Sequence, residues 1–162
     1  MSVRKDVWSW GIVAVVLLLI GAAAFWVFWP QLSQPHTKLR LGDGVFQARI
    51  ADTSSEREKG LSGTAYLGQD QALLFVYERD DKWSIWMKDM NYAIDIVWLD
   101  KDKKVVYIVK NAKPESYPSE SFVPNEPARY VVEFVAGTVD KKTINIGDVA
   151  AFDEAQLRGD RT

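Results

Sequence analysis

The first feature of the chain is an uninterrupted apolar run from Val7 to Trp29, which contains no charged residue. At about 1.5 Å per residue, a helix of this length crosses a hydrocarbon core of roughly 30 Å. Tryptophans stand near both ends of the run, and indole rings favour the headgroup level of a bilayer. The run therefore predicts a single transmembrane helix over residues 7–29.

Two basic residues, Arg4 and Lys5, precede this run. The positive-inside rule then predicts a cytoplasmic tail of residues 1–6, one pass through the cytoplasmic membrane and a C-terminal domain outside. The alternative is a cleaved signal peptide, because alanines at 22–24 offer small residues where a peptidase could cut. The apolar run continues beyond that point to Trp29, which favours a retained anchor.

After the anchor the pattern changes. Two prolines in residues 30–37 predict a short, stiff stalk. Short alternating runs bounded by turn residues then predict a mainly β (α+β) domain over residues 38–153, followed by a polar tail at 154–162. We expect a small barrel-like or sandwich β domain with one or two short helices. The candidate strands are residues 39–41, 45–50, 73–77, 82–87, 94–99, 105–109, 130–135 and 149–152.

Turn and capping residues punctuate these runs. Gly42-Asp43-Gly44 predicts a hairpin between the first two candidate strands. Thr53 and Glu56 have the spacing of a capping box, so a short helix is expected to begin after Thr53. Gly60 stands where that helix would end. A further helical turn is expected over residues 138–142.

Composition narrows the chemistry that the domain can support. The formal net charge is −2 and no basic patch stands out, which argues against a nucleic-acid partner. The chain has no cysteine, so disulfides, thiolate nucleophiles and cysteine metal sites are excluded. His36 is the only histidine and falls in the predicted stalk. We therefore expect neither a metal centre nor a cofactor.

Five short blocks of residues follow one another from about residue 50 to residue 152. They are Ala51-Asp52-Thr53 with Arg57 and Gly60-Leu61, then Leu73-Leu74-Phe75, then Trp86-Met87-Lys88 with Ile94-Asp95-Ile96, then Glu133-Phe134-Val135-Ala136-Gly137, and last Ile146-Gly147-Asp148. In this order they resemble family 192 of the domains of unknown function, an uncharacterised prokaryotic family of small β-rich proteins. The family pattern usually has asparagine where Asp89 stands. The resemblance implies a β-rich fold and assigns no activity.

Two carboxylates stand inside apolar strands. Asp95 lies between Ile94 and Ile96, and an ionised carboxylate is costly to bury without a partner. Asp95 is either a structural residue that accepts hydrogen bonds from backbone amides of the 89–93 loop, or a ligand-binding residue. Glu133 alternates with valines, and is either a surface residue on the solvated side or a pocket acid.

Trp86 and Lys88 stand two residues apart before the strand of Asp95, so their side chains point to one face. A tight reversal would bring Lys88 near Asp95, making a polar cluster with an aromatic wall that suits a small polar ligand. The alternative is a lysine–aspartate pair that only fixes the loop. Trp83 and Trp86 are either both in the core, or one of them stands exposed beside a cleft.

The function expected from these features is a membrane-anchored extracytoplasmic domain that serves as a binding or accessory module for a small polar or envelope-derived ligand. The candidate ligand-binding residues are Trp86, Lys88, Asp95 and Glu133. One alternative is an envelope-polymer hydrolase, in which Asp95 and Glu133 would face each other roughly 5 to 10 Å apart. Another is a scaffold that contacts a second membrane protein, which a closed apolar interior without a groove would favour.

Overall fold

The computed structural model describes residues 13, 15, 16 and 35–153. The chain divides into two compact units, Met1–Gln34 and Pro35–Thr162. Of the predicted anchor, the described residues are Val13, Val15 and Val16, which are helical and exposed. The rest of the anchor and the predicted tail lie outside the described residues. Within the described part of the chain, no helix is long and apolar enough to cross a membrane.

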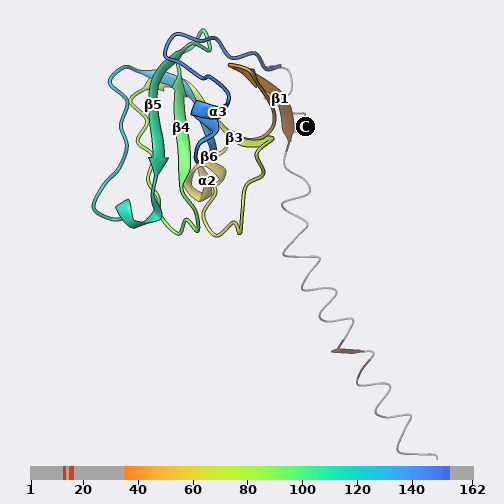
Figure 1. Ribbon diagram of the computed structural model, residues 1–162. Helices are drawn as coiled ribbons and strands as arrows, with labels where there is room; N and C mark the ends of the chain where they lie inside the picture. Colours follow the sequence, from red (N-terminus) through yellow and green to blue (C-terminus); the bar gives the residue numbers. More distant parts are fainter. Residues whose placement is uncertain (1–12, 14, 17–34, 154–162) are drawn as a thin grey trace, which may run out of the picture. The chain divides into compact units, whose positions relative to one another are not determined.

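The second unit is built on one six-stranded sheet with two short α-helices (Figure 1). The elements in chain order are β1 His36–Leu41, β2 Gly44–Ala51, α2 Ser54–Lys59, β3 Gln71–Asp81, β4 Ile94–Leu99, β5 Val105–Ala112, the 3-10 helix η1 Pro114–Ser116, β6 Ala128–Val135 and α3 Thr138–Lys141. The strand order is β1-β2-β3-β6-β4-β5, and only the pair β2 and β3 is parallel. This confirms the predicted mainly β, α+β class.

Local sequence explains the hairpin of β1 and β2 and the connection from β2 to β3. Leu41 stands opposite Gly44, which leaves a two-residue turn where the glycines predicted it. Gly42 has φ 53°, a left-handed conformation that glycine adopts without strain. Helix α2 begins after Thr53 as predicted, and its crossover makes β2 and β3 run parallel.

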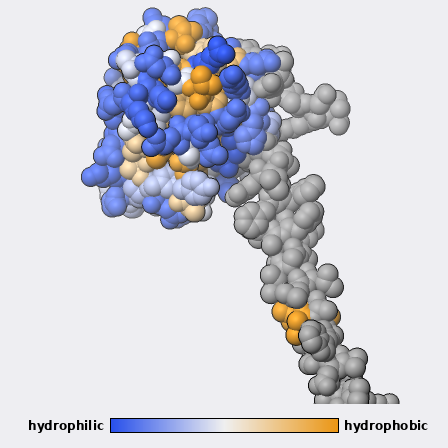
Figure 2. Space-filling model, turned by 45° about the vertical axis from the view of Figure 1, so that its right-hand side comes forward, coloured by the Kyte–Doolittle hydropathy of each residue, from blue (hydrophilic) through white to orange (hydrophobic). Residues whose placement is uncertain are grey.

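Each face of the sheet carries its own apolar cluster. The face that we call the α3 face carries Leu39, Phe46, Ile50, Leu74, Val97, Leu99, Val132 and Phe134, packed with Val139, Ile144, Ala150 and Phe152. The face that we call the α2 face carries Ala51, Leu73, Phe75, Tyr77, Ile94, Ile96, Trp98 and Val131, packed with Leu61, Ile85 and Met87. The sheet is therefore a central layer with a core on both sides, and the surface visible in Figure 2 is mainly hydrophilic with small hydrophobic patches.

The sheet departs from the predicted barrel-like or sandwich arrangement. Within residues 35–153 it is a single open sheet whose edges are β1 and β5, so it neither closes on itself nor packs against a second sheet there. The candidate strand at 149–152 contributes only isolated bridges, in which Val149 meets Lys104 and Ala151 meets Arg40. His36, expected in the stalk, is the first residue of β1.

The candidate strand at residues 82–87 is also absent. Ile85 makes one isolated bridge, to Phe122, and the rest of this segment pairs with no strand. Its alternating pattern has another cause, since Ile85 and Met87 are buried on the α2 face while Trp86 is exposed. The alternation thus reflects a segment that lies across the sheet and buries every second side chain.

Candidate functional site

One row of residues crosses the α2 face of the sheet. Arg49 of β2 is paired with Leu73 of β3, Leu73 with Glu133 of β6, and Glu133 with Ile96 of β4. Side chains in one row point to the same face, and two strand spacings separate Arg49 from Glu133 by about 10 Å along the sheet. A cation and a carboxyl therefore occupy an otherwise apolar surface.

Glu133 is the most unusual residue of this row. It is only 4% exposed, and its Oε2 atom has no hydrogen-bond partner among the described residues. Burial raises the pKa of the Glu133 carboxyl to about 8, and the nearby Arg49 guanidinium limits that rise. At neutral pH the carboxyl is therefore mostly protonated, so it offers an O–H donor as well as an acceptor oxygen.

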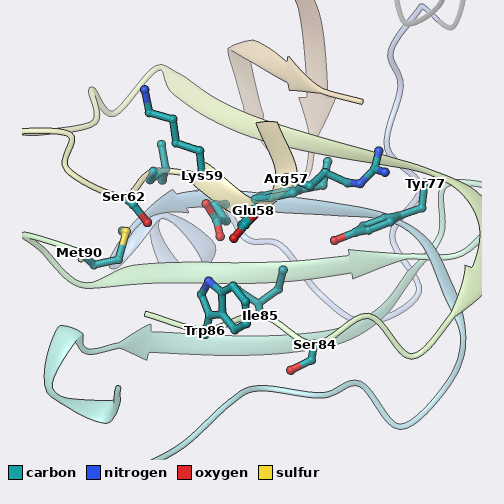
Figure 3. Close-up of a pocket in the computed structure, with 13 residues that line it drawn as sticks. Arg57, Glu58, Lys59, Ser62, Tyr77, Ser84, Ile85, Trp86 and Met90 are labelled. Carbon is teal, nitrogen blue, oxygen red and sulfur yellow. The ribbon is translucent and has the colours of Figure 1, made fainter. Parts of the chain in front are cut away.

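A pocket of about 180 Å³ opens over Glu133. Figure 3 shows Arg57, Glu58 and Lys59 of α2 on one side and Ile85 and Trp86 on the facing side. Tyr77 lies at one end, and Ser62 and Met90 lie at the other. The remaining lining residues are Gly60, Leu61, Phe75, Ser84 and Glu133. The pocket thus combines a buried acid, a partly cationic rim and an apolar and aromatic wall.

Helix α2 is held in place at both ends, and this positions the rim of the pocket. At its start, the Glu56 amide donates to Thr53 Oγ1 at 3.3 Å, and the Thr53 amide donates to the Glu56 carboxylate at 3.0 Å. This is the capping box that the sequence predicts. After its end, Arg49 Nη2 donates to the Gly60 carbonyl at 3.2 Å. The half-buried Arg49 of the sheet therefore also fixes the chain that borders the pocket.

A stack of four side chains extends from one end of the pocket, where two of them, Arg57 and Tyr77, line it. Arg57 lies over the Tyr77 ring, with 5.0 Å from Cζ to the ring centroid, and Arg57 Nη1 donates to the Val76 carbonyl at 2.9 Å. Tyr77 is stacked on Trp83 with the ring centroids 4.0 Å apart. Arg79 closes the stack 5.5 Å from the Trp83 ring centroid. Cation–π contacts on both sides of an aromatic pair hold Tyr77 in a fixed orientation.

Two of the predicted binding residues, Trp86 and Glu133, meet at this pocket. Trp86 is 47% exposed and lines it, whereas Trp83 is partly buried against the core, so the two tryptophans differ as one of the two interpretations expected. Lys88 is exposed and is absent from the lining. The backbone carbonyl of Lys88 accepts a 2.7 Å hydrogen bond from Ser62 Oγ, which lines the pocket.

Asp95, by contrast, lies on the other side of the sheet. It is 1% exposed, and its two carboxylate oxygens accept 2.9 Å hydrogen bonds from the amides of Asn111 and Val139. Val139 belongs to the first turn of α3 and Asn111 to the edge strand β5, so Asp95 fastens α3 to the sheet and also bonds to the neighbouring strand. The predicted cluster of Lys88 with Asp95 is therefore wrong, because the Lys88 segment lies on the α2 face. Asp95 does accept hydrogen bonds from backbone amides, but these belong to Asn111 and Val139 and not to the predicted 89–93 loop.

The same geometry separates the two carboxylates of the hydrolase alternative. Glu133 is paired with Ile96, and Asp95 is paired with Phe134. Side chains at consecutive positions of adjacent strands point to opposite faces. Asp95 and Glu133 therefore do not share a pocket, and the proposed pair of catalytic carboxylates is not formed.

Asp89 stands where the family resemblance expects asparagine. Its backbone has φ 55°, in the left-handed region that asparagine and aspartate adopt more readily than most residues. Its carbonyl accepts a 2.8 Å hydrogen bond from the Gly63 amide, which ties this turn to the chain after α2. Backbone conformation thus accounts for the residue type at position 89 without a ligand.

Several residues that line the pocket or border it were not predicted from the sequence. Arg57 stands in the first block of the family resemblance, which was a signal that it has a role. Arg49 and Tyr77 belong to alternating strands, where a polar residue on an inward position gives the only hint. Among the described residues, no three His, Asp or Glu side chains cluster in a way that could hold a metal ion.

The fold and the pocket define a class of small α+β domains with a buried acid beneath a crossover helix. The chain belongs to DUF192, described as "Uncharacterized ACR", whose family model matches residues 37–152. This confirms the predicted family.

Relatives are found among both sequences and structures. A "UPF0127 protein" of Thermococcus sibiricus is 33% identical over 104 residues, and the match spans 63% of each chain, less than two thirds of that relative. A "UPF0127 protein" of Thermococcus gammatolerans is 31% identical over 125 residues, 76% of each chain.

Two crystal structures share the fold. One is of a Sinorhizobium meliloti 1021 protein described as a candidate transcription regulator, with a TM-score of 0.67, 26% identity and coverage of 77% of this chain and 96% of that one. The other is of a Novosphingobium aromaticivorans protein of unknown function, with a TM-score of 0.65, 26% identity and coverage of 72% of this chain and 83% of that one.

Proposed function

We propose that this protein is a membrane-anchored, extracytoplasmic binding module that holds a small polar ligand in the pocket over Glu133. One observation carries the proposal. Glu133 lines a pocket open to solvent, yet its Oε2 atom is buried and has no partner among the described residues. Buried polar atoms are normally paired, and an unpaired one costs roughly 1 to 3 kcal/mol. A ligand that bonds to Oε2 would remove this cost.

The anchor and the orientation rest on the sequence. The uncharged run of residues 7–29 has the length and the flanking tryptophans of a transmembrane helix. Arg4 and Lys5 before it favour a cytoplasmic N-terminus. The binding domain would then work outside the cytoplasmic membrane, close to its surface.

Binding is favoured over hydrolysis by the contents of the pocket. Its acidic residues are Glu58, which is exposed on α2, and Glu133 at the base. The second carboxylate of the hydrolase hypothesis, Asp95, faces α3 instead. A single buried acid and an aromatic wall suit recognition of a ligand, with polar contacts that orient it and apolar contacts that shield it.

A thermal-shift screen of small polar compounds against the full-length chain in a non-ionic detergent tests this proposal. We expect at least one compound to raise the melting temperature, and the rise to be lost in Glu133→Ala and reduced in Trp86→Ala. Tyr66→Ala is the matched control, because Tyr66 is an exposed aromatic residue outside the pocket lining. A compound that stabilises all three variants equally binds elsewhere and contradicts the proposal.

A further inference from the structure

The charges around the Glu133 pocket favour one class of ligand. Arg57 and Lys59 line the rim, and Arg49 lies behind Gly60, whose carbonyl it holds. All three side chains are basic. Against them stand the exposed Glu58 and the buried Glu133. The region is therefore electropositive whenever Glu133 carries its proton.

The geometry also indicates which kind of ligand atom can form a hydrogen bond with Glu133. No ion pair joins Arg49 to Glu133 among the contacts of the described residues, so Oε2 is left without a donor from the protein. Glu133 lines the pocket, and a protonated carboxyl there carries an O–H donor. Its natural complement is an acceptor oxygen, and a negatively charged one forms the stronger bond.

The size and the wall of the pocket limit the rest of the ligand. A volume of about 180 Å³ has room for a small organic molecule. Phe75, Ile85 and Trp86 supply apolar and aromatic surface. An inorganic oxyanion would leave this surface unused, whereas an organic acid with a short carbon chain would cover it.

We propose that the Glu133 pocket binds a small organic carboxylate, whose oxygen accepts the Glu133 O–H and whose charge is balanced by Arg49, Arg57 and Lys59. This inference rests on the proposed function and names the chemical class of its ligand. It also makes binding depend on the proton of the Glu133 carboxyl.

The dependence on pH follows from the groups that face Glu133. The ionisable neighbours are Arg49 of β2, Tyr77 of β3, Arg57, Glu58 and Lys59 of α2, and Tyr92 of the segment before β4. Burial raises the pKa of Tyr77 to about 12 and also raises that of Tyr92, so neither loses its proton near neutral pH. From β4 the facing residue is the apolar Ile96. The pKa of Glu133, by contrast, is about 8, so the protonation of this carboxyl changes near that pH.

Three probes of the same shape and different charge test the inference: butyrate, butyramide and butylammonium. Each is titrated into the full-length chain in a non-ionic detergent, and binding is followed by the NMR signal of the Trp86 indole N–H, assigned with Trp86→Phe. We expect butyrate to bind more tightly than butyramide below pH 8. Above pH 8 its affinity should fall by up to tenfold for each pH unit, because one proton is bound with each anion.

Glu133→Gln keeps the shape of the side chain and removes its ionisable proton. Its amide keeps an N–H donor at every pH, so butyrate binding should persist above pH 8 without the decline. Glu78→Gln is the matched control, because Glu78 is an exposed residue of β3 outside the pocket, and it should keep the decline. If Glu133→Gln does not fold, calorimetry of the unmodified protein at pH 8.5 in two buffers of different ionisation enthalpy should show proton uptake on binding.

The outcomes distinguish a failure of the carboxylate inference from a failure of the proposed binding function. Preferential binding of butylammonium, with affinity that rises above pH 8, would overturn the carboxylate inference and leave the binding function intact. Equal binding of butyrate and butyramide at all pH values would do the same. A Trp86 signal that moves with none of the three probes would count against this inference, and failure of the wider compound screen would also remove the proposed function.

Discussion

Asp95 of β4 and Glu133 of β6 lie one register position apart on adjacent strands and point to opposite faces of the sheet. Asp95 bonds to two backbone amides and fastens α3, whereas Glu133 keeps an unpaired oxygen at the base of a pocket. Two acids in similar sequence surroundings thus have different roles. The difference is decided by what packs on each face, and it leads to opposite expectations for the same substitution.

Asp95→Asn is expected to lower the free energy of unfolding by about 2 to 3 kcal/mol. The asparagine amide has one acceptor oxygen, so either the Asn111 or the Val139 amide would face an N–H donor and lose its bond in a buried site. Ligand binding over Glu133 should be unchanged in the folded fraction. Urea denaturation measures the first effect, and a titration with a pocket ligand measures the second.

Asp140→Asn is the matched control for this change. Asp140 lies in α3, is exposed, and forms a surface ion pair with Lys110 at 2.5 Å. Exposed pairs contribute little, so the loss should stay below about 1 kcal/mol. An Asp95→Asn protein that is as stable as the control, yet no longer binds ligand, would show that Asp95 belongs to the binding site after all.

Glu133→Gln is expected to change how stability depends on pH. The Glu133 pKa is about 8 in the folded protein, against about 4.3 in an unfolded chain. Between these values unfolding releases a proton, so the contribution of Glu133 to stability is present below pH 4.3 and is lost as pH rises to about 8. The free energy of unfolding should therefore fall, relative to Glu133→Gln, by up to about 1.4 kcal/mol per pH unit over this range.

Urea denaturation of both proteins at unit steps from pH 5 to pH 9 measures this difference. It should grow up to pH 8 and then remain constant. Glu78→Gln, the same chemical change at an exposed position of β3, should run parallel to the unmodified protein. Parallel curves for Glu133→Gln as well would mean that the Glu133 carboxyl is ionised in the folded protein and is paired with a cation.

The sequence predicted those parts of the fold that are determined by neighbouring residues. Gly42 marked the hairpin turn, and Thr53 with Glu56 marked the start of α2, because a turn and a cap depend on a few consecutive residues. The alternation in residues 82–87 predicts a strand, whereas in the structure it comes from Ile85 and Met87 packing on the sheet. Burial of every second side chain does not require a paired strand.

The site was predicted only in part, for a related reason. Alternation correctly puts Asp95 opposite Ile94 and Ile96 within its own strand. It cannot say which face of β4 matches which face of β6, because that depends on the register of Ile96 with Glu133. Arg49 stands two strands from Glu133 and 84 positions earlier in the chain, so its proximity depends on the sheet order.

Thr53→Ala is expected to loosen α2 and, with it, the rim of the pocket. The change removes the acceptor of the Glu56 amide and the 2.7 Å hydrogen bond from Thr53 Oγ1 to the Glu56 carboxylate, at a cost of about 1 kcal/mol. Amide hydrogen exchange over α2 should become faster. Ser55→Ala, at an exposed position of the same helix, should leave the exchange slow. Equal exchange in both variants would show that the cap does not hold this helix.

The last prediction concerns where the domain stands. If residues 7–29 form a retained anchor and Arg4 and Lys5 keep the N-terminus inside, residues 38–153 are outside the cytoplasmic membrane. Protease added to intact spheroplasts should then remove the domain without lysis, and the chain should stay in the membrane fraction after a high-salt wash.

Replacing Arg4 and Lys5 by glutamate while adding three lysines after Trp29 reverses the charge difference and should reduce this accessibility, because the basic flank sets the orientation. The otherwise unmodified chain with Ser2 and Val3 replaced by alanine is the control, and its domain should remain accessible. A domain that stays protected until lysis would overturn the orientation, and release of the intact domain into the medium would favour the cleaved signal peptide instead.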